Sequence, residues 1–201
     1  MSVTEISAVL RRRRKALNTA TKFTFLRILL IPLFMVCMYL SKAHDWLYYV
    51  SLAVFILASL TDLLDGYIAR KYHQVTDLGK FLDPLADKVL VLAAMCILCN
   101  WGKFPAWALM IVLTREFAVS GLRMIASNKG RVIAAGWSGK VKTVVTMVAL
   151  CFMILLQAQL PVKLLGDTVI GIISWIYIAA ISFTTLYSGV EYFVQNSDAL
   201  H

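Results

Sequence analysis

The chain has 201 residues, of which 60% are hydrophobic, and it carries a formal net charge of +9. Because soluble globular domains contain about 45–50% apolar residues, this composition excludes an ordinary soluble domain and indicates an integral membrane protein with one membrane domain. The basic residues cluster in alternate connections between apolar segments, which is typical of a topology signal. The positive charge therefore predicts no nucleic-acid partner.

Six apolar segments in the sequence predict six transmembrane helices and an all-α fold. A crossing needs about 20 residues, and only the last two uncharged runs, 143–162 and 168–190, reach that length. We therefore expect the first four helices to continue into charged sequence. The predicted spans are 22–41, 46–70, 78–100, 104–127, 138–160 and 166–192.

The distribution of Lys and Arg predicts the orientation of these spans. Seven of the 20 basic residues lie before position 28, four lie in 70–88 and six in 115–142, whereas the other connections hold the remaining three. By the positive-inside rule, both termini and the charged helix ends are cytoplasmic. Charged side chains at membrane depth face water or protein and not lipid, so the helices are expected to surround a polar cavity that opens to the cytoplasm.

The two ends of the chain are more polar than the segment between them. We expect a basic N-terminal segment on the membrane surface, 1–21, a six-helix domain, 22–193, and a cytoplasmic tail, 194–201. The basic run from Arg11 to Lys15 is suited to anionic lipid. An equally plain role for this run is to fix the orientation of the first span.

Four aspartates lie at the cytoplasmic ends of the second and third predicted spans. They are Asp62, Asp65, Asp83 and Asp87. Residues three or four positions apart share one helix face, so each pair points in one direction. Carboxylate oxygens are hard ligands that favour Mg²⁺, Mn²⁺ or Ca²⁺, and two metal ions about 3.5–4 Å apart are a common device for displacement at phosphorus. The spacing therefore predicts a divalent-metal site.

Small residues and one arginine accompany these aspartates. Gly66, Ala69 and Gly79 remove side-chain bulk beside the carboxylates, so that a large group can approach the backbone. Arg70 adds a planar donor that is always charged and suits a phosphate. The alternative is a helix pair held only by ion pairs between the aspartates and Arg70.

Four further cations lie at the same predicted depth in the fourth and fifth spans: Arg115, Arg123, Lys140 and Lys142. Arg115 and Arg123 are two helical turns apart, on one face, and Glu116 is expected to pair with one of them. So many cations indicate a substrate that brings its own phosphate. The alternative is that they serve only the membrane topology.

The aspartate string resembles the signature of the CDP-alcohol phosphatidyltransferase family, D-x-x-D-G-x-x-A-R, eight residues, then G-x-x-x-D-x-x-x-D. The resemblance implies six transmembrane helices, two divalent ions (Mg²⁺ or Mn²⁺), and transfer of a phosphatidyl group from a CDP-linked lipid to an alcohol, with release of CMP. It also implies a homodimer in a membrane.

The same resemblance implies a role for each residue of the string. Asp62, Asp65 and Asp83 would bind one metal ion, and Asp62, Asp83 and Asp87 would contact the second. Asp87 would be the general base that deprotonates the acceptor. The CDP part of the lipid would lie against Asp62 and against the small and basic residues, which are Gly66, Ala69, Arg70 and Gly79.

The acceptor has to be inferred from the rest of the chain. Residues 18–193 are similar to bacterial members of the family that use sn-glycerol 3-phosphate, which implies CDP-diacylglycerol as donor, phosphatidylglycerophosphate as product and a bacterial inner membrane as the location. The acceptor phosphate would then lie on Arg115, Arg123, Lys140 and Lys142. Alternatives with the same chemistry use inositol phosphate or phosphatidylglycerol. Alternatives of other classes are a divalent-cation transporter and a membrane prenyltransferase.

Overall fold

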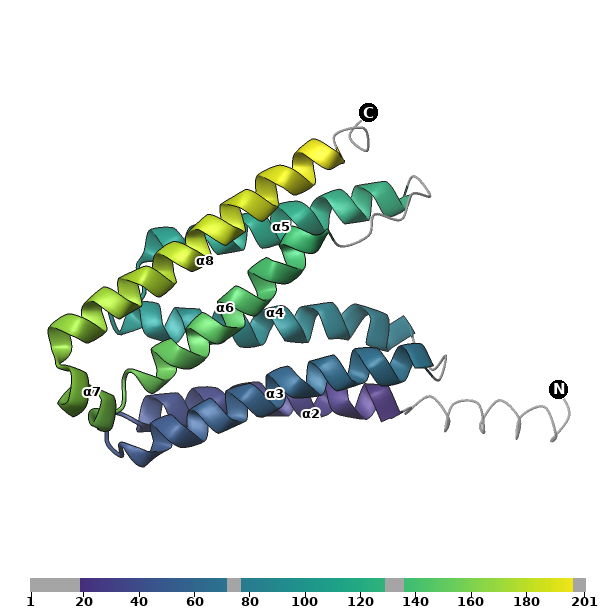
Figure 1. Cartoon of the computed structure of the whole chain (residues 1–201). Coiled ribbons are helices and arrows are strands. Elements are labelled where there is room, and N and C mark those ends of the chain that lie inside the picture. Colours follow the sequence, from purple (N-terminus) through teal and green to yellow (C-terminus); the bar gives the residue numbers. More distant parts are fainter. Residues whose placement is uncertain (1–18, 72–76, 129–135, 197–201) are drawn as a thin grey trace, which may run out of the picture. The chain divides into compact units, whose positions relative to one another are not determined.

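The computed structural model describes residues 19–71, 77–128 and 136–196, and within them the side chains of 26–61, 88–126 and 136–196. These residues form seven helices and no strand (Figure 1). The helices are α2 (Thr19–Leu40), α3 (Trp46–Lys71), α4 (Asp77–Asn100), α5 (Ala106–Asn128), α6 (Trp137–Leu155), α7 (Gln159–Leu165) and α8 (Asp167–Gln195). The all-α prediction is confirmed. The chain divides into two compact units, Met1–Ala93 and Ala94–His201.

The first four predicted spans correspond to α2, α3, α4 and α5, which begin and end within a few residues of the expected positions. Helices α3 and α4 are continuous through the charged segments. Their mainly apolar stretches, Trp46–Thr61 and Lys88–Asn100, are shorter than a membrane crossing. The expectation that these helices extend beyond their apolar runs is therefore confirmed.

The fifth predicted span, 138–160, is wrong at its C-terminal end. Helix α6 ends at Leu155, and the short helix α7 begins at Gln159. Pro161 explains the break, because proline has no backbone N–H and its ring clashes with the carbonyl four residues earlier, so it is tolerated only in the first turn of a helix. Gly166, with φ of 77°, then separates α7 from α8.

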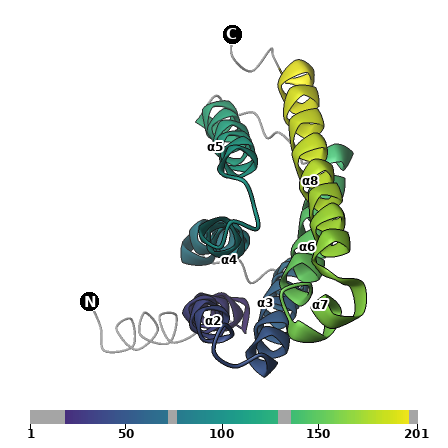
Figure 2. The same cartoon turned by 90° about the vertical axis from the view of Figure 1, so that its left-hand side faces the viewer.

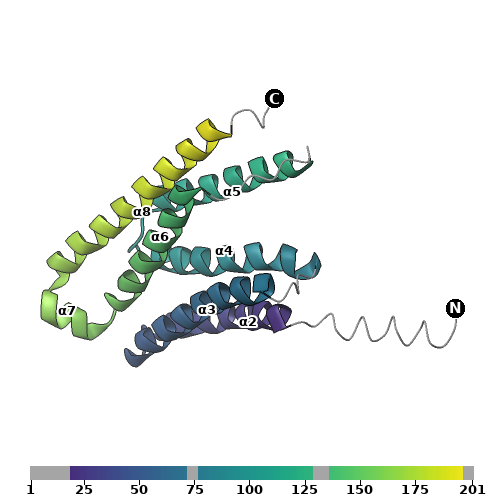
Figure 3. The ribbon, with the colours of Figure 1, turned by 45° about the vertical axis from the view of Figure 1, so that its right-hand side comes forward.

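Of the described helices, α6 and α8 are long and apolar enough to cross a membrane. They belong to the second unit, where they run antiparallel and are joined by α7, as the views in Figures 2 and 3 show. Helix α8 packs against both α6 and α5. Helix α8 is therefore the element of this unit on which both α5 and α6 pack.

The first unit is built on the hairpin of α2 and α3, which pack side by side along their length (Figure 1). Phe34 of α2 and Phe55 of α3 are fully buried in this contact, with ring centroids 5.6 Å apart. Ser51 lies in the first part of α3 and donates to the Leu47 carbonyl at 2.7 Å, which satisfies its buried hydroxyl. The contact fixes α3, the helix that carries the first two aspartates.

The Phe34–Phe55 contact predicts which residues of α3 maintain the fold. Phe55→Ala should leave a cavity and cost about 3 kcal/mol of unfolding free energy, seen as a lower thermal unfolding temperature in detergent. Leu57→Ala is the matched control, because Leu57 is 56% exposed on the same helix. Equal shifts for the two variants would contradict the buried α2–α3 contact.

Candidate functional site

The aspartate string is divided between two helices. Asp62 and Asp65 lie in the C-terminal turns of α3, and Asp83 and Asp87 lie in the N-terminal half of α4. Because both helices are uninterrupted there, residues three or four apart share a face, as the sequence predicted. The side chains of 62–71 and 77–87 lie outside the described residues.

The metal and donor-lipid assignments therefore stay predictions. They concern Asp62, Asp65, Gly66, Ala69, Arg70, Gly79, Asp83 and Asp87. The metal ligands predicted from the sequence suit the expected ions, since four carboxylates on two helices supply the oxygen ligands that Mg²⁺ and Mn²⁺ prefer.

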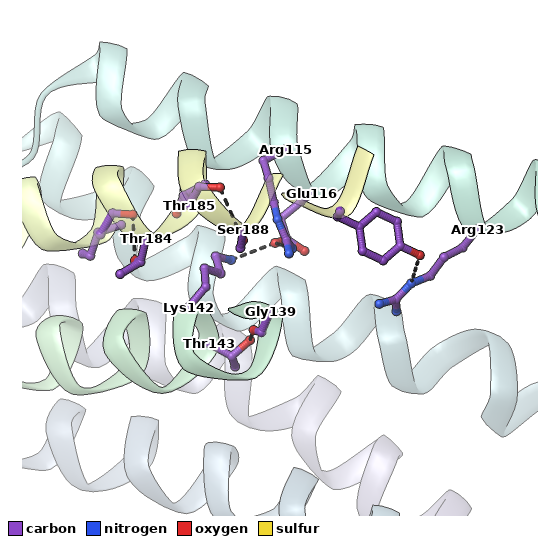
Figure 4. Close-up of polar contacts among 11 residues, drawn as sticks. Arg115, Glu116, Arg123, Gly139, Lys142, Thr143, Thr184, Thr185 and Ser188 are labelled. Atoms are coloured by element: carbon purple, nitrogen blue, oxygen red, sulfur yellow. Dashed lines mark hydrogen bonds and ion pairs between the residues drawn. The ribbon is translucent and has the colours of Figure 1, made fainter. Parts of the chain in front are cut away.

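The second unit contains a described ionic cluster that joins α5 to α6. One oxygen of Glu116, Oε1, accepts from Arg115 Nη1 at 2.8 Å and from Lys142 Nζ at 2.7 Å (Figure 4). The three side chains are only 13% (Arg115), 16% (Glu116) and 6% (Lys142) exposed. Glu116 was expected to pair with an arginine; it pairs with Arg115 and, in addition, with Lys142.

Two glycines from different helices flank the Arg115 side chain. A Cβ atom at Gly189 of α8 would lie 3.1 Å from Arg115 Cγ, and one at Gly139 of α6 would lie 3.4 Å from Arg115 Nη2. The first distance is tighter than ordinary van der Waals contact. Arg115 therefore occupies a slot between these two glycines. The slot is tight at Gly189, where a Cβ atom would crowd Arg115, whereas a Cβ atom at Gly139 would make an ordinary contact.

Buried polar atoms continue from this cluster along the contact of α6 and α8. Arg115 Nε is buried with no hydrogen-bond partner among the described residues, and so are the hydroxyls of Thr146, Ser182 and Thr185. Ser188, which is also buried, donates to the Thr185 carbonyl at 3.4 Å (Figure 4). We call Thr146, Ser182, Thr185 and Ser188 the hydroxyl seam.

Arg123 is held differently from Arg115. Its Nε donates to the Tyr192 hydroxyl at 3.0 Å, and its guanidinium carbon lies 5.3 Å from the centre of the same ring. Tyr192 is buried in a cluster with Val119, Leu122 and Ala126 of α5. A residue of α8 therefore orients a cation of α5.

The four predicted acceptor-site cations thus fall into three groups. Arg115 and Lys142 meet on Glu116, and Arg123 meets Tyr192. Lys140 is exposed and makes no ion pair among the described residues. The structure therefore brings together two of the four predicted residues.

Sequence reasoning missed the residues of α8. Gly189 and Tyr192 contact cations that lie about 70 positions earlier in the chain. A signal was present, since Ser182, Thr185 and Ser188 recur every three residues in a mainly apolar helix, which places them near one helix face.

Comparison with known proteins agrees with the aspartate string. Residues 17–187 match the CDP-alcohol phosphatidyltransferase model, so the chain belongs to the CDP-alcohol phosphatidyltransferase family. This family is membrane-associated, in keeping with the apolar helices.

Individual relatives are similar over most of their length. A CDP-diacylglycerol–glycerol-3-phosphate 3-phosphatidyltransferase of Bacillus subtilis (strain 168) is 40% identical over 195 residues, covering 91% of this chain and 97% of that protein. One of Salmonella typhimurium (strain LT2) is 40% identical over 182 residues, covering 87% and 92%. A probable phosphatidylglycerophosphate synthase of Mycobacterium tuberculosis (strain H37Rv) is 35% identical over 182 residues, covering 90% and 82%.

The contact between Arg123 and Tyr192 predicts a stability order for variants of α8. Tyr192→Phe keeps the ring but loses the hydrogen bond to a charged group, a cost of about 1.5 kcal/mol. Tyr192→Ala also empties the buried cluster and should cost more. Tyr187→Phe, on an exposed tyrosine of the same helix, is the control. Equal free energies of unfolding in detergent for Tyr192→Phe and this control would contradict the contact between Arg123 and Tyr192.

Proposed function

We propose that the protein transfers the phosphatidyl group of CDP-diacylglycerol to sn-glycerol 3-phosphate, giving phosphatidylglycerophosphate and CMP. The observation that carries the proposal is the full aspartate string at family spacing on two uninterrupted helices, α3 and α4. Membership of the family supports the reaction class. The names of relatives that match this chain over almost their whole length support the acceptor.

In this proposal the string provides the donor half of the site. Asp62, Asp65 and Asp83 hold one divalent ion, and Asp87 replaces Asp65 at a second. Bound Mg²⁺ or Mn²⁺ would supply charge neutralisation of the diphosphate and of the departing CMP.

The remaining residues of the string form the proposed binding site for the CDP group. Gly66, Ala69 and Gly79 leave space for the CDP group against the backbone. Arg70 supplies a fixed pair of donors for a phosphate oxygen.

Asp87 is the proposed general base. Its carboxylate takes the proton from an acceptor hydroxyl. The acceptor oxygen then bonds to the phosphorus that carries the diacylglycerol, the phosphoanhydride bond to the second phosphorus breaks, and CMP leaves with that bond's electron pair. The proton remains on Asp87 until it passes to solvent.

The ionic cluster provides the acceptor half. Arg115 and Lys142 place two positive charges against the single negative charge of Glu116, which leaves one net positive charge to attract a phosphate dianion. Arg123, fixed by Tyr192 on the same face of α5, adds another donor about 12 Å along the helix. Lys140 is exposed and would act through its charge at the entrance.

The proposal includes a location. Six long helices would cross a bacterial inner membrane around a polar cavity that opens to the cytoplasm, with both termini on that side, as the basic residues favour. Two copies of the chain would form a homodimer, as the sequence resemblance implies.

The decisive experiment is an acceptor panel with purified protein, CDP-diacylglycerol and Mg²⁺. Labelled glycerol 3-phosphate should enter phosphatidylglycerophosphate with one CMP released for each product molecule, and chelation of the metal should stop both. Inositol phosphate and phosphatidylglycerol should give no product. Labelled product from either of these, with none from glycerol 3-phosphate, would refute glycerol 3-phosphate as the acceptor. It would leave phosphatidyl transfer as the reaction class.

Substitution of the aspartates tests the donor half. Asp62→Asn and Asp83→Asn should abolish CMP release, because each removes a ligand proposed to serve both metal ions. Asp87→Asn should retain binding of CDP-diacylglycerol and lose about 10²- to 10⁴-fold in turnover, the usual contribution of a general base. Asp167→Asn, in the exposed first turn of α8, is the control and should be unchanged. Normal CMP release by Asp62→Asn would refute the metal assignment.

A further inference from the structure

We propose that Glu116 and Gly189 are positioning residues that hold the Arg115 guanidinium and the Lys142 ammonium as one preorganised receptor for a phosphate monoester. The inference rests on the proposed function, since it assigns the receptor to the acceptor's phosphate. It goes further by naming the residues that set the receptor's geometry without touching the acceptor.

The first support is electrostatic. Two cations held 2.8 and 2.7 Å from one carboxylate oxygen are close enough to repel each other strongly where water is largely excluded. The Lys142 side chain is 6% exposed, and a buried charge without a partner is strongly destabilising. Glu116 therefore stabilises the charged Arg115 and Lys142 side chains next to each other in the absence of a bound phosphate.

The second support is the set of donors that the cluster leaves free. Arg115 uses Nη1 for Glu116, whereas its Nε is buried and has no partner among the described residues. A guanidinium carries five N–H donors in a fixed plane and binds phosphate through two of them. A buried donor without a partner is costly, so a phosphate oxygen at Nε would remove that cost.

The third support is the glycine slot. At Gly189 a Cβ atom would meet Arg115 Cγ at 3.1 Å, and at Gly139 it would meet Nη2 at 3.4 Å. A Cβ atom at Gly121 of α5 or Gly171 of α8 would meet nothing within 4 Å. Among the glycines that the structure describes, a Cβ atom would come closer than 3.4 Å to a neighbour at Gly189, and that neighbour is Arg115.

A purely structural role for Glu116, as a link between α5 and α6, would affect stability and both substrates together. A role as a competitor would repel the phosphate, and its removal would then improve binding of the acceptor. The positioning role predicts a third pattern, in which only the affinity for the acceptor falls. Separate KM values for the two substrates distinguish these roles.

The test measures CMP release by purified protein while one substrate is varied and the other is saturating. Gly189→Ala should raise KM for glycerol 3-phosphate about tenfold, the loss expected when one hydrogen bond to a charged group is misplaced. KM for CDP-diacylglycerol and kcat should stay unchanged. Gly171→Ala is the matched control on α8 and should behave as wild type.

Glu116→Gln provides a second, independent variant. It keeps the size and one acceptor oxygen of the side chain but removes the charge, so KM for glycerol 3-phosphate should rise and inhibition by inorganic phosphate should weaken in parallel. An unchanged or lower KM would overturn the inference, as would equal effects of Gly189→Ala and Gly171→Ala. If Gly189→Ala does not yield folded protein, Glu116→Gln carries the test alone, because a Cβ atom at Gly139 would make only an ordinary contact with Arg115.

Binding of inorganic phosphate separates this inference from the proposed function. If wild-type protein fails to use glycerol 3-phosphate, the proposed function fails, but calorimetric titration with inorganic phosphate still compares wild type with Gly189→Ala. Weaker binding by the variant supports the receptor whatever the acceptor is. Equal binding overturns it.

Discussion

One carboxylate oxygen, Oε1 of Glu116, links the helices of the second unit that carry the proposed binding site for the acceptor phosphate. Glu116 Oε1 joins a cation of α5 to a cation of α6, and α8 closes the slot in which the first cation lies. In an apolar chain every such charge is costly unless it is paired. The pairing therefore limits how α5, α6 and α8 pack, and it also leaves an excess of positive charge in the place where a phosphate group is expected.

The hydroxyl seam extends this polarity into the contact of α6 and α8. Among apolar helices in lipid, association depends on close packing and on interhelical hydrogen bonds. The buried side chains of Thr146, Ser182, Thr185 and Ser188 are small enough to allow the close packing. The printed hydrogen bond of Ser188 goes to the Thr185 carbonyl of its own helix. The opposite face of α8, with Ile176, Phe183 and Val190 among its exposed residues, is apolar, as a surface toward acyl chains should be.

Much of the fold could be predicted because its signals are local. Apolar runs located the long helices, and Lys142 shares its buried face with Thr146, Ala149 and Met153 at helical spacing, which separates it from exposed Lys140. The break at Pro161 was also a local signal and was overlooked. The contacts of Arg115 with Gly189 and of Arg123 with Tyr192 could not be predicted, because they depend on how helices far apart in sequence pack. The aspartate side chains lie outside the described residues, so their roles rest on spacing and family membership.

The lengths of the two apolar helices are unequal. With a rise of about 1.5 Å per residue, the 29 residues of α8 span about 43 Å, whereas the 19 residues of α6 span about 28 Å, close to the roughly 30 Å of a hydrocarbon core. A membrane-spanning α8 would therefore tilt or project into the headgroup region, and its tilt would respond to the thickness of the bilayer. Since Gly189 and Tyr192 lie near the C-terminal end of α8, hydrophobic mismatch would act directly on the helix that contacts both Arg115 and Arg123.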